Sequence, residues 1–135
     1  MRQPASNHFL FANDLFSQWL GIEQLELQPG FCKLKMVIRN EMCNGFGIAH
    51  GGITYSFADS ALAFASNTAE KQSLSIETSI SHIKKLIPGD EIIATATQKS
   101  NSNKIGVYEV VVTTETGELV ALFKGTVYQR NQSGG

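Results

Sequence analysis

Hydrophobic and polar positions divide the chain into a central apolar helix flanked by shorter elements. From His50 to Thr68 the residues are apolar or small on nearly every side, and Asp59 is the one carboxylate among them. Such a segment is typical of a buried helix. An earlier helix with Leu15, Phe16 and Trp19 on one side is expected to begin at a cap on Ser6 or Asn7 and to end at Gly21. Partial alternation of apolar and polar residues predicts strands over residues 22–27, 31–39, 73–87, 91–99, 104–114 and 118–128.

The order of these elements limits the fold. Two strands precede the long helix and four follow it, and the last two form a hairpin across Thr116 and Gly117. Crowded strands beside one very apolar helix favour an α+β fold, in which an antiparallel sheet wraps around that helix. We expect one domain over residues 1–130 and a flexible tail over residues 131–135. The aromatic residues of the first helix are expected to pack in the core or in a dimer, or to form a lid.

Composition excludes several classes of protein. The chain has 135 residues, 42% hydrophobic and 17% charged, with a net charge of −1, which indicates a folded domain. No basic stripe is present, so a nucleic-acid partner is not expected. There is neither the apolar core of a signal peptide nor an apolar run long enough to span a membrane. Cys32 and Cys43 show no metal or redox spacing, and we expect reduced thiols in a cytoplasmic protein.

Asp59 is the strongest candidate for chemistry. Its neighbours Phe57, Ala58, Ala61 and Leu62 are apolar or small. A carboxylate in such surroundings loses hydration, so it needs partners or a raised pKa. Groups of this kind concentrate at functional sites. The alternative is that Asp59 lies on a narrow polar stripe of the helix together with Ser56, Ser60 and Ser66.

The turn before the helix is the second candidate. Gly51 and Gly52 follow His50, and glycine suits a helix start that another group must approach closely. The first amides of a helix have no partner inside it, and the helix dipole is positive there. A carbonyl oxygen that becomes negative during a reaction would be stabilised at this point. The alternative is a tight turn without a catalytic role.

Spacing constrains how these candidates combine. Asp59 follows Gly51 by eight residues, which corresponds to about 12 Å along a helix. One helix therefore cannot bring both groups to the same carbonyl. If they share a site, Asp59 comes from a second copy of the helix that packs roughly antiparallel, which implies a two-fold dimer with two shared sites.

The run Asn44-Gly45, His50-Gly51-Gly52, Phe57-Ala58-Asp59-Ser60-Ala61 and Ala65-Ser66-Asn67 resembles the signature of the hotdog-fold acyl-CoA thioesterases. The branch named for phenylacetate degradation is the closest, because the branch acting on dihydroxynaphthoyl-CoA usually has Glu on the helix. The resemblance covers the chain from the first strand to Tyr128. It implies the hotdog fold and hydrolysis of an aryl or medium-chain acyl-CoA.

The resemblance also implies roles for individual residues. The thioester carbonyl would lie at the Gly51 amide, with Asn44 as a second donor or as a support for the carbonyl. Asp59 of a partner chain would act as general base or as nucleophile, and Ser75 would orient the water. His50 would lie near the departing thiolate or brace the loop.

The substrate would need further contacts. Coenzyme A carries phosphates, which favour nearby cations. The candidate residues for binding the substrate are Gly52, Ser60, Lys84, Lys85 and Lys104. No metal or other cofactor is expected, because attack of water on a thioester needs only a base and an oxyanion site. We expect self-association as a dimer, and the resemblance suggests a dimer of dimers. The alternatives are a non-catalytic acyl-CoA binding module and a hydratase or dehydratase of the same fold.

Overall fold

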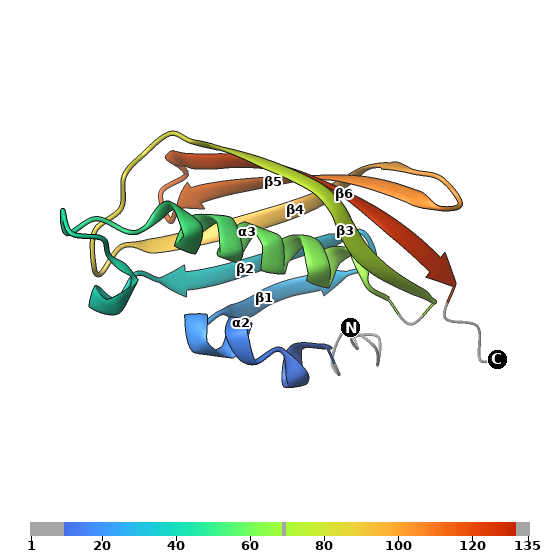
Figure 1. Ribbon diagram of the computed structural model, residues 1–135, viewed down its shortest axis with the longest axis horizontal. Coiled ribbons are helices and arrows are strands. Elements are labelled where there is room, and N and C mark those ends of the chain that lie inside the picture. Colours follow the sequence, from blue (N-terminus) through green and yellow to red (C-terminus); the bar gives the residue numbers. More distant parts are fainter. Residues whose placement is uncertain (1–9, 69, 132–135) are drawn as a thin grey trace.

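The computed structural model describes residues 10–68 and 70–131, in which a curved antiparallel sheet encloses one long helix (Figure 1). The sheet order is β1-β2-β4-β5-β6-β3, so β1 and β3 are its edges. This is the predicted α+β arrangement. The helices are α2 (Leu15–Leu20), the 3-10 turn η1 (Asn40–Met42) and α3 (Gly51–Ser66), and the strands are β1 (Glu23–Gln28), β2 (Phe31–Val37), β3 (Lys71–His82), β4 (Glu91–Asn101), β5 (Ile105–Thr114) and β6 (Leu119–Asn131).

The core lies between α3 and the concave face of the sheet. Phe57, Leu62 and Phe64 of the helix are buried completely or nearly so, and alternate residues of the strands meet them. At Gly125 of β6, a Cβ atom would lie 2.5 Å from Leu62 Cδ2. A strand can cross the helix this closely only where it has no side chain, so the sheet packs tightly onto α3.

The first helix differs from its prediction. Asp14 interrupts it, because the Asp14 carboxylate accepts a hydrogen bond from the Ser17 amide at 2.9 Å and caps a new helix, α2. Gly21 ends α2 in the left-handed conformation, as predicted. Leu15, Phe16 and Trp19 of α2 are 76%, 52% and 48% exposed, so they do not pack in the core of the chain. Their packing in a dimer or their role as a lid stays a prediction. The predicted cap at Ser6 or Asn7 lies outside the described residues.

The strand after α3 is shorter than predicted. It ends at His82, where the regular pairing with β6 stops. The Ile83 and Lys84 amides both donate to the Val120 carbonyl, and the Leu86 carbonyl accepts from Ala49 in the loop before α3. Residues 83–90 therefore form a loop that lies against the start of α3. The last strand is longer than predicted and includes Asn131.

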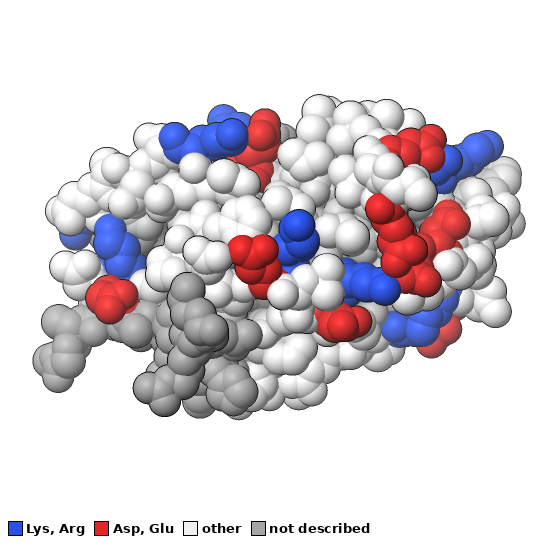
Figure 2. Space-filling model, turned by 180° about the vertical axis from the view of Figure 1, so that it is seen from behind, with Lys and Arg blue, Asp and Glu red and all other residues white. Residues whose placement is uncertain are grey.

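Charges on the face opposite α3 are mixed in sign. Figure 2 shows lysine and arginine residues next to aspartate and glutamate residues on this face. Ion pairs such as Lys35–Glu91 at 2.7 Å and Lys99–Glu109 at 3.6 Å join neighbouring strands. Among the residues that the structure describes, this face therefore has no continuous basic surface. Within residues 10–68 and 70–131, no helix has the length and apolarity that a membrane span requires.

Candidate active site

The first turn of α3 leaves one backbone amide for a ligand. His50 caps the helix: its Nδ1 atom accepts a hydrogen bond from the Gly52 amide at 2.9 Å. The His50 carbonyl accepts from the Ile53 amide at 2.9 Å. The Gly51 amide makes no hydrogen bond with any residue that the structure describes. Gly51 is also exposed, so its N–H lies at the positive end of the helix dipole and is accessible to a substrate.

Asn44 holds the loop that leads to this turn. Its Oδ1 atom accepts from the Phe46 amide at 2.9 Å and from the Ile48 amide at 3.4 Å. The Asn44 amide itself donates to the Ile48 carbonyl at 2.8 Å, and Gly47 has a φ of 79° that favours glycine. Because Oδ1 is used inside the loop, the side-chain nitrogen of Asn44 is the atom that can donate to a substrate.

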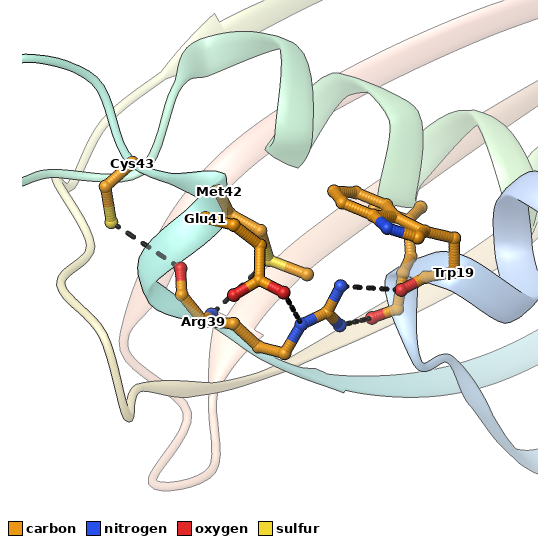
Figure 3. Close-up of polar contacts among 6 residues, drawn as sticks. Trp19, Arg39, Glu41, Met42 and Cys43 are labelled. Atoms are coloured by element: carbon orange, nitrogen blue, oxygen red, sulfur yellow. Dashed lines mark hydrogen bonds and ion pairs between the residues drawn. The ribbon is translucent and has the colours of Figure 1, made fainter.

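Arg39 fixes the base of the same loop (Figure 3). Its guanidinium donates to the carbonyls of Trp19 at 2.7 Å and Leu20 at 3.1 Å, and it lies 4.8 Å from the centre of the Trp19 ring. The Arg39 carbonyl accepts from the Met42 amide, and Glu41 pairs with the guanidinium at 3.3 Å. A cation at the C-terminus of α2 satisfies carbonyls that have no partner inside the helix. Arg39 thereby links α2 to the turn that begins the loop.

A cavity of about 340 Å³ opens at the start of α3. Asn44 and Gly51 line it together with Lys84 and Lys85. His82 and Thr54 also line it. The cavity therefore combines possible hydrogen-bond donors with two cationic side chains.

Asp59 lies in a second cavity of about 260 Å³, which is further along α3 than the first. Ser75 of β3 lines the same cavity. The walls of this cavity combine apolar residues with polar ones: Leu10, Leu62, Ala63, Leu74 and Val127 beside Ser66, Asn67, Gln72 and Ser73. Burial raises the pKa of Asp59 above its ordinary value, and the negative charge of Asp14 raises it further. In the single chain the structure thus separates Asp59 and Ser75 from Asn44 and Gly51.

Comparison with known proteins identifies the family. The thioesterase superfamily profile matches residues 46–121, which is more than half of the chain. The chain belongs to the thioesterase superfamily. It is a thioester hydrolase with the hotdog fold.

Individual relatives support this assignment. A putative esterase of Archaeoglobus fulgidus is 37% identical over 92% of this thioesterase and 80% of the relative. The acyl-coenzyme A thioesterase PaaI of Escherichia coli is 30% identical, over 87% of this chain and 84% of PaaI. The solved structure of E. coli PaaI, from the phenylacetic acid degradation operon, superposes with a TM-score of 0.88 at 29% identity and covers 91% of this chain and 89% of its own.

Four other residues predicted for the site of this thioesterase lie as follows. His50 and Gly52 are bonded to each other at the helix start, so His50 braces the turn. Ser60 is buried and shares a 2.7 Å hydrogen bond with Ser17 of α2, and it lines neither cavity. Lys104 lies 5.8 Å from the centre of the Tyr128 ring, and Tyr128 pairs with Leu74 at the sheet end that carries the Asp59 cavity.

The two cysteines of the thioesterase are free thiols. Cys32 donates to the Ala61 carbonyl at 3.2 Å, and burial raises the pKa of its thiol to about 12. A thiol with such a pKa is not a nucleophile at neutral pH.

Sequence reasoning missed His82 and Asp14. His82 is separated from Gly51 by 31 positions and shares no motif with it. Asp14 is a helix cap by type, and its effect on Asp59 depends on how α2 packs against α3. The Lys84-Lys85 pair two residues after His82 was the one local signal that this strand end lies at a site.

Asp14 provides a test of the electrostatics around Asp59. In Asp14→Asn the cap is retained, because asparagine also caps helices well, while the negative charge is lost. We expect the pKa of Asp59 to fall, since Asp14 raises it. Activity that needs ionised Asp59 would then persist to lower pH. The pH dependence of kcat/KM measures this, and an acidic limb that stays in place or moves to higher pH would contradict it.

Proposed function

We propose that this thioesterase hydrolyses an aryl acyl-CoA of the phenylacetyl type, or a medium-chain acyl-CoA, to the free acid and coenzyme A. One observation carries the proposal: α3 presents an unpaired N–H at Gly51 and, eight residues later, a carboxylate of raised pKa at Asp59. The Gly51 N–H can stabilise a carbonyl oxygen that gains negative charge, and the Asp59 carboxylate can act as a base or nucleophile. The relative PaaI, named an acyl-coenzyme A thioesterase, supports coenzyme A as the carrier.

The proposed site is shared between two subunits. Asp59 and Gly51 are too far apart on one helix to meet one carbonyl, so a second subunit supplies the carboxylate. The edge strand β3 supports this arrangement, because it borders both cavities. Its outer backbone edge extends over 12 residues, and Leu74 and Ile76 beside it are 70% and 60% exposed. A long unpaired strand edge with exposed apolar side chains beside it favours pairing with another chain.

Two-fold pairing of β3 with its copy would be antiparallel. The end of β3 at His82 would then lie toward the partner's end near Ser75, so that the cavity with Gly51 faces the cavity with Asp59. A dimer of two such dimers and a cytoplasmic location remain predictions.

The cavity beside Asp59 suits the acyl group. Its volume is about 260 Å³ and its walls include Leu10, Leu62, Leu74 and Val127. An apolar cavity of roughly 150 Å³ binds benzene, so this one has space for an aromatic ring with a short linker, or for a medium-length chain. The similarity to PaaI from a phenylacetic acid degradation operon favours the aryl group.

The proposed reaction uses water and no cofactor. The carbonyl oxygen accepts from the Gly51 amide and the Asn44 side-chain nitrogen. Either Asp59 of the partner subunit takes a proton from a water held by Ser75, and this water attacks the carbonyl carbon, or Asp59 attacks the carbon itself. In both routes the C–S bond breaks and coenzyme A leaves as its thiolate. The second route forms an acyl anhydride, which water then hydrolyses to release the acid and restore the carboxylate. Lys84 and Lys85 flank the opening of the Gly51 cavity, where they attract the phosphates of coenzyme A.

A panel of thioesters tests this function. Phenylacetyl-, hydroxyphenylacetyl-, benzoyl-, hexanoyl- and acetyl-CoA are incubated with the protein, and free thiol is measured. We expect the highest kcat/KM with a phenylacetyl-type or hexanoyl substrate and little release from acetyl-CoA, which leaves the cavity beside Asp59 empty. Tight binding by calorimetry without thiol release from any member would instead support a non-catalytic binding module.

A further inference from the structure

The side chain of His82 lies against the catalytic end of α3, although it belongs to β3. Its Nε2 and Cε1 atoms are 3.3 Å and 3.4 Å from the point that a Cβ atom on Gly51 would occupy. The ring edge that carries Nε2 therefore faces Gly51. His82 also lines the cavity that contains Gly51 and Asn44.

The ring of His82 is exposed and has no hydrogen-bond partner among residues 10–68 and 70–131. Its backbone pairs with Ala121 of β6, which fixes the position of its Cα without using the side chain. A histidine with a purely structural role usually bonds to a neighbour, as His50 does here. The side chain of His82 is thus held next to the helix start with its Nε2 atom free.

The other backbone amides around Gly51 are already used. The Gly52 and Ile53 amides donate to His50, and the Ala49 and His50 amides donate to the carbonyls of Leu86 and Met42. In the described part of the chain, the Gly51 N–H is therefore the one free backbone donor there, beside the side-chain nitrogen of Asn44, and an oxyanion site gains from each further preorganised donor. An Nε2–H beside Gly51 is well placed to be such a donor.

We propose that His82 is a further catalytic residue, whose Nε2–H donates a hydrogen bond to the thioester carbonyl oxygen at the Gly51 amide. This inference rests on the proposed acyl-CoA hydrolysis. As oxygen bonds to the carbonyl carbon, the C=O π electrons move to the carbonyl oxygen, and both N–H groups stabilise the resulting charge. When the C=O bond re-forms, the C–S bond breaks and the electron pair leaves on sulfur. His82 keeps its proton throughout.

Two variants separate this role from packing. His82→Phe keeps a flat ring against Gly51 but has no N–H, whereas His82→Gln keeps a side-chain N–H at similar reach. We expect His82→Phe to lower kcat by about 10²-fold, as loss of one oxyanion donor does, with KM changed less than about threefold. His82→Gln should recover about tenfold of that loss. Circular dichroism and thermal unfolding control for the fold.

A binding measurement gives a second readout. A coenzyme A-linked trifluoromethyl ketone forms a tetrahedral hydrate whose hydroxyl oxygen stands in for the oxyanion, while the matching methyl ketone stays planar. His82→Phe should weaken the first ligand by the factor by which kcat falls and should leave the second unchanged.

Three results would overturn the inference while the wild type remains active: an unchanged kcat, an increase in KM alone, or equal losses in His82→Phe and His82→Gln. The second result would assign His82 to coenzyme A anchoring, and the third to packing. A wild type without activity on any thioester would overturn the proposed function, and this inference with it.

Discussion

Replacing Asp59 with asparagine is expected to lower kcat by about 10³-fold, which is the typical contribution of a positioned base. Asparagine keeps the size and most hydrogen bonds of the side chain but can neither take a proton nor attack a carbonyl. Because Asp59 lies in its own cavity and not among the lysines of the other one, substrate affinity should change little. Thiol release and calorimetry with the preferred acyl-CoA measure the two quantities separately.

The matched control is Glu26→Gln, the same change at an exposed carboxylate of β1. It should leave kcat unchanged. An Asp59→Asn protein that folds and retains more than a tenth of the wild-type turnover would remove Asp59 from the mechanism.

The same substitution should increase stability at neutral pH. Burial raises the pKa of Asp59 above its ordinary value of 3.8, so ionising this group opposes folding. The stability associated with protonated Asp59 is complete below pH 3.8 and is lost as the pH rises through the raised pKa. At pH 7 the Asp59→Asn variant, which carries no charge there, should therefore unfold at a higher temperature than the wild type. A lower unfolding temperature would indicate that Asp59 serves the fold.

Replacing Gly51 with proline should have the second large effect, because it removes one oxyanion donor. We expect turnover to fall by a factor between about 10² and 10³, which is the usual cost of losing such a donor. Proline removes the N–H and nothing else from the helix, because the first helical position needs no internal hydrogen bond. The preceding residue also permits it: His50 has φ −61° and ψ 138°, the extended conformation that proline requires before it. Thiol release from the preferred acyl-CoA measures the loss.

Gly51→Ala is the matched control. Both substitutions add a Cβ atom at 3.3 Å from His82 Nε2, so they disturb the neighbouring ring alike. Alanine retains the N–H. We expect Gly51→Ala to keep at least about tenfold more activity than Gly51→Pro. Equal activities in the two variants would show that crowding at His82, and not the amide, causes the loss.

Much of the fold could be predicted because its signals are local. The apolar residues from His50 onward predict a buried helix, and the structure confirms α3 at Gly51–Ser66. The turn at Gly89 and Asp90 and the hairpin before Leu119 also agree. The strand after α3 was predicted too long, since its end depends on contacts of Ile83 and Lys84 with Val120 of a distant strand.

The candidate site could be predicted only in part. Gly51 and Asp59 stand out by local rules, because glycine is unusual in a helix and a carboxylate is unusual among apolar residues. The residues that lie beside these two groups and affect their chemistry come from other parts of the chain. Asp14 and His82 are placed by the packing of α2 and by the end of β3, and no spacing in the sequence encodes either contact.

The central claim is that one site uses the Gly51 amide of one subunit and the Asp59 carboxylate of another. It is tested by a heterodimer of Gly51→Pro and Asp59→Asn chains, co-expressed with two different tags and purified through both. In the heterodimer one shared site keeps both groups and the other has lost both. We expect about half of the wild-type activity per dimer, although each homodimer is nearly inactive. A verified heterodimer no more active than the two homodimers would contradict the shared site.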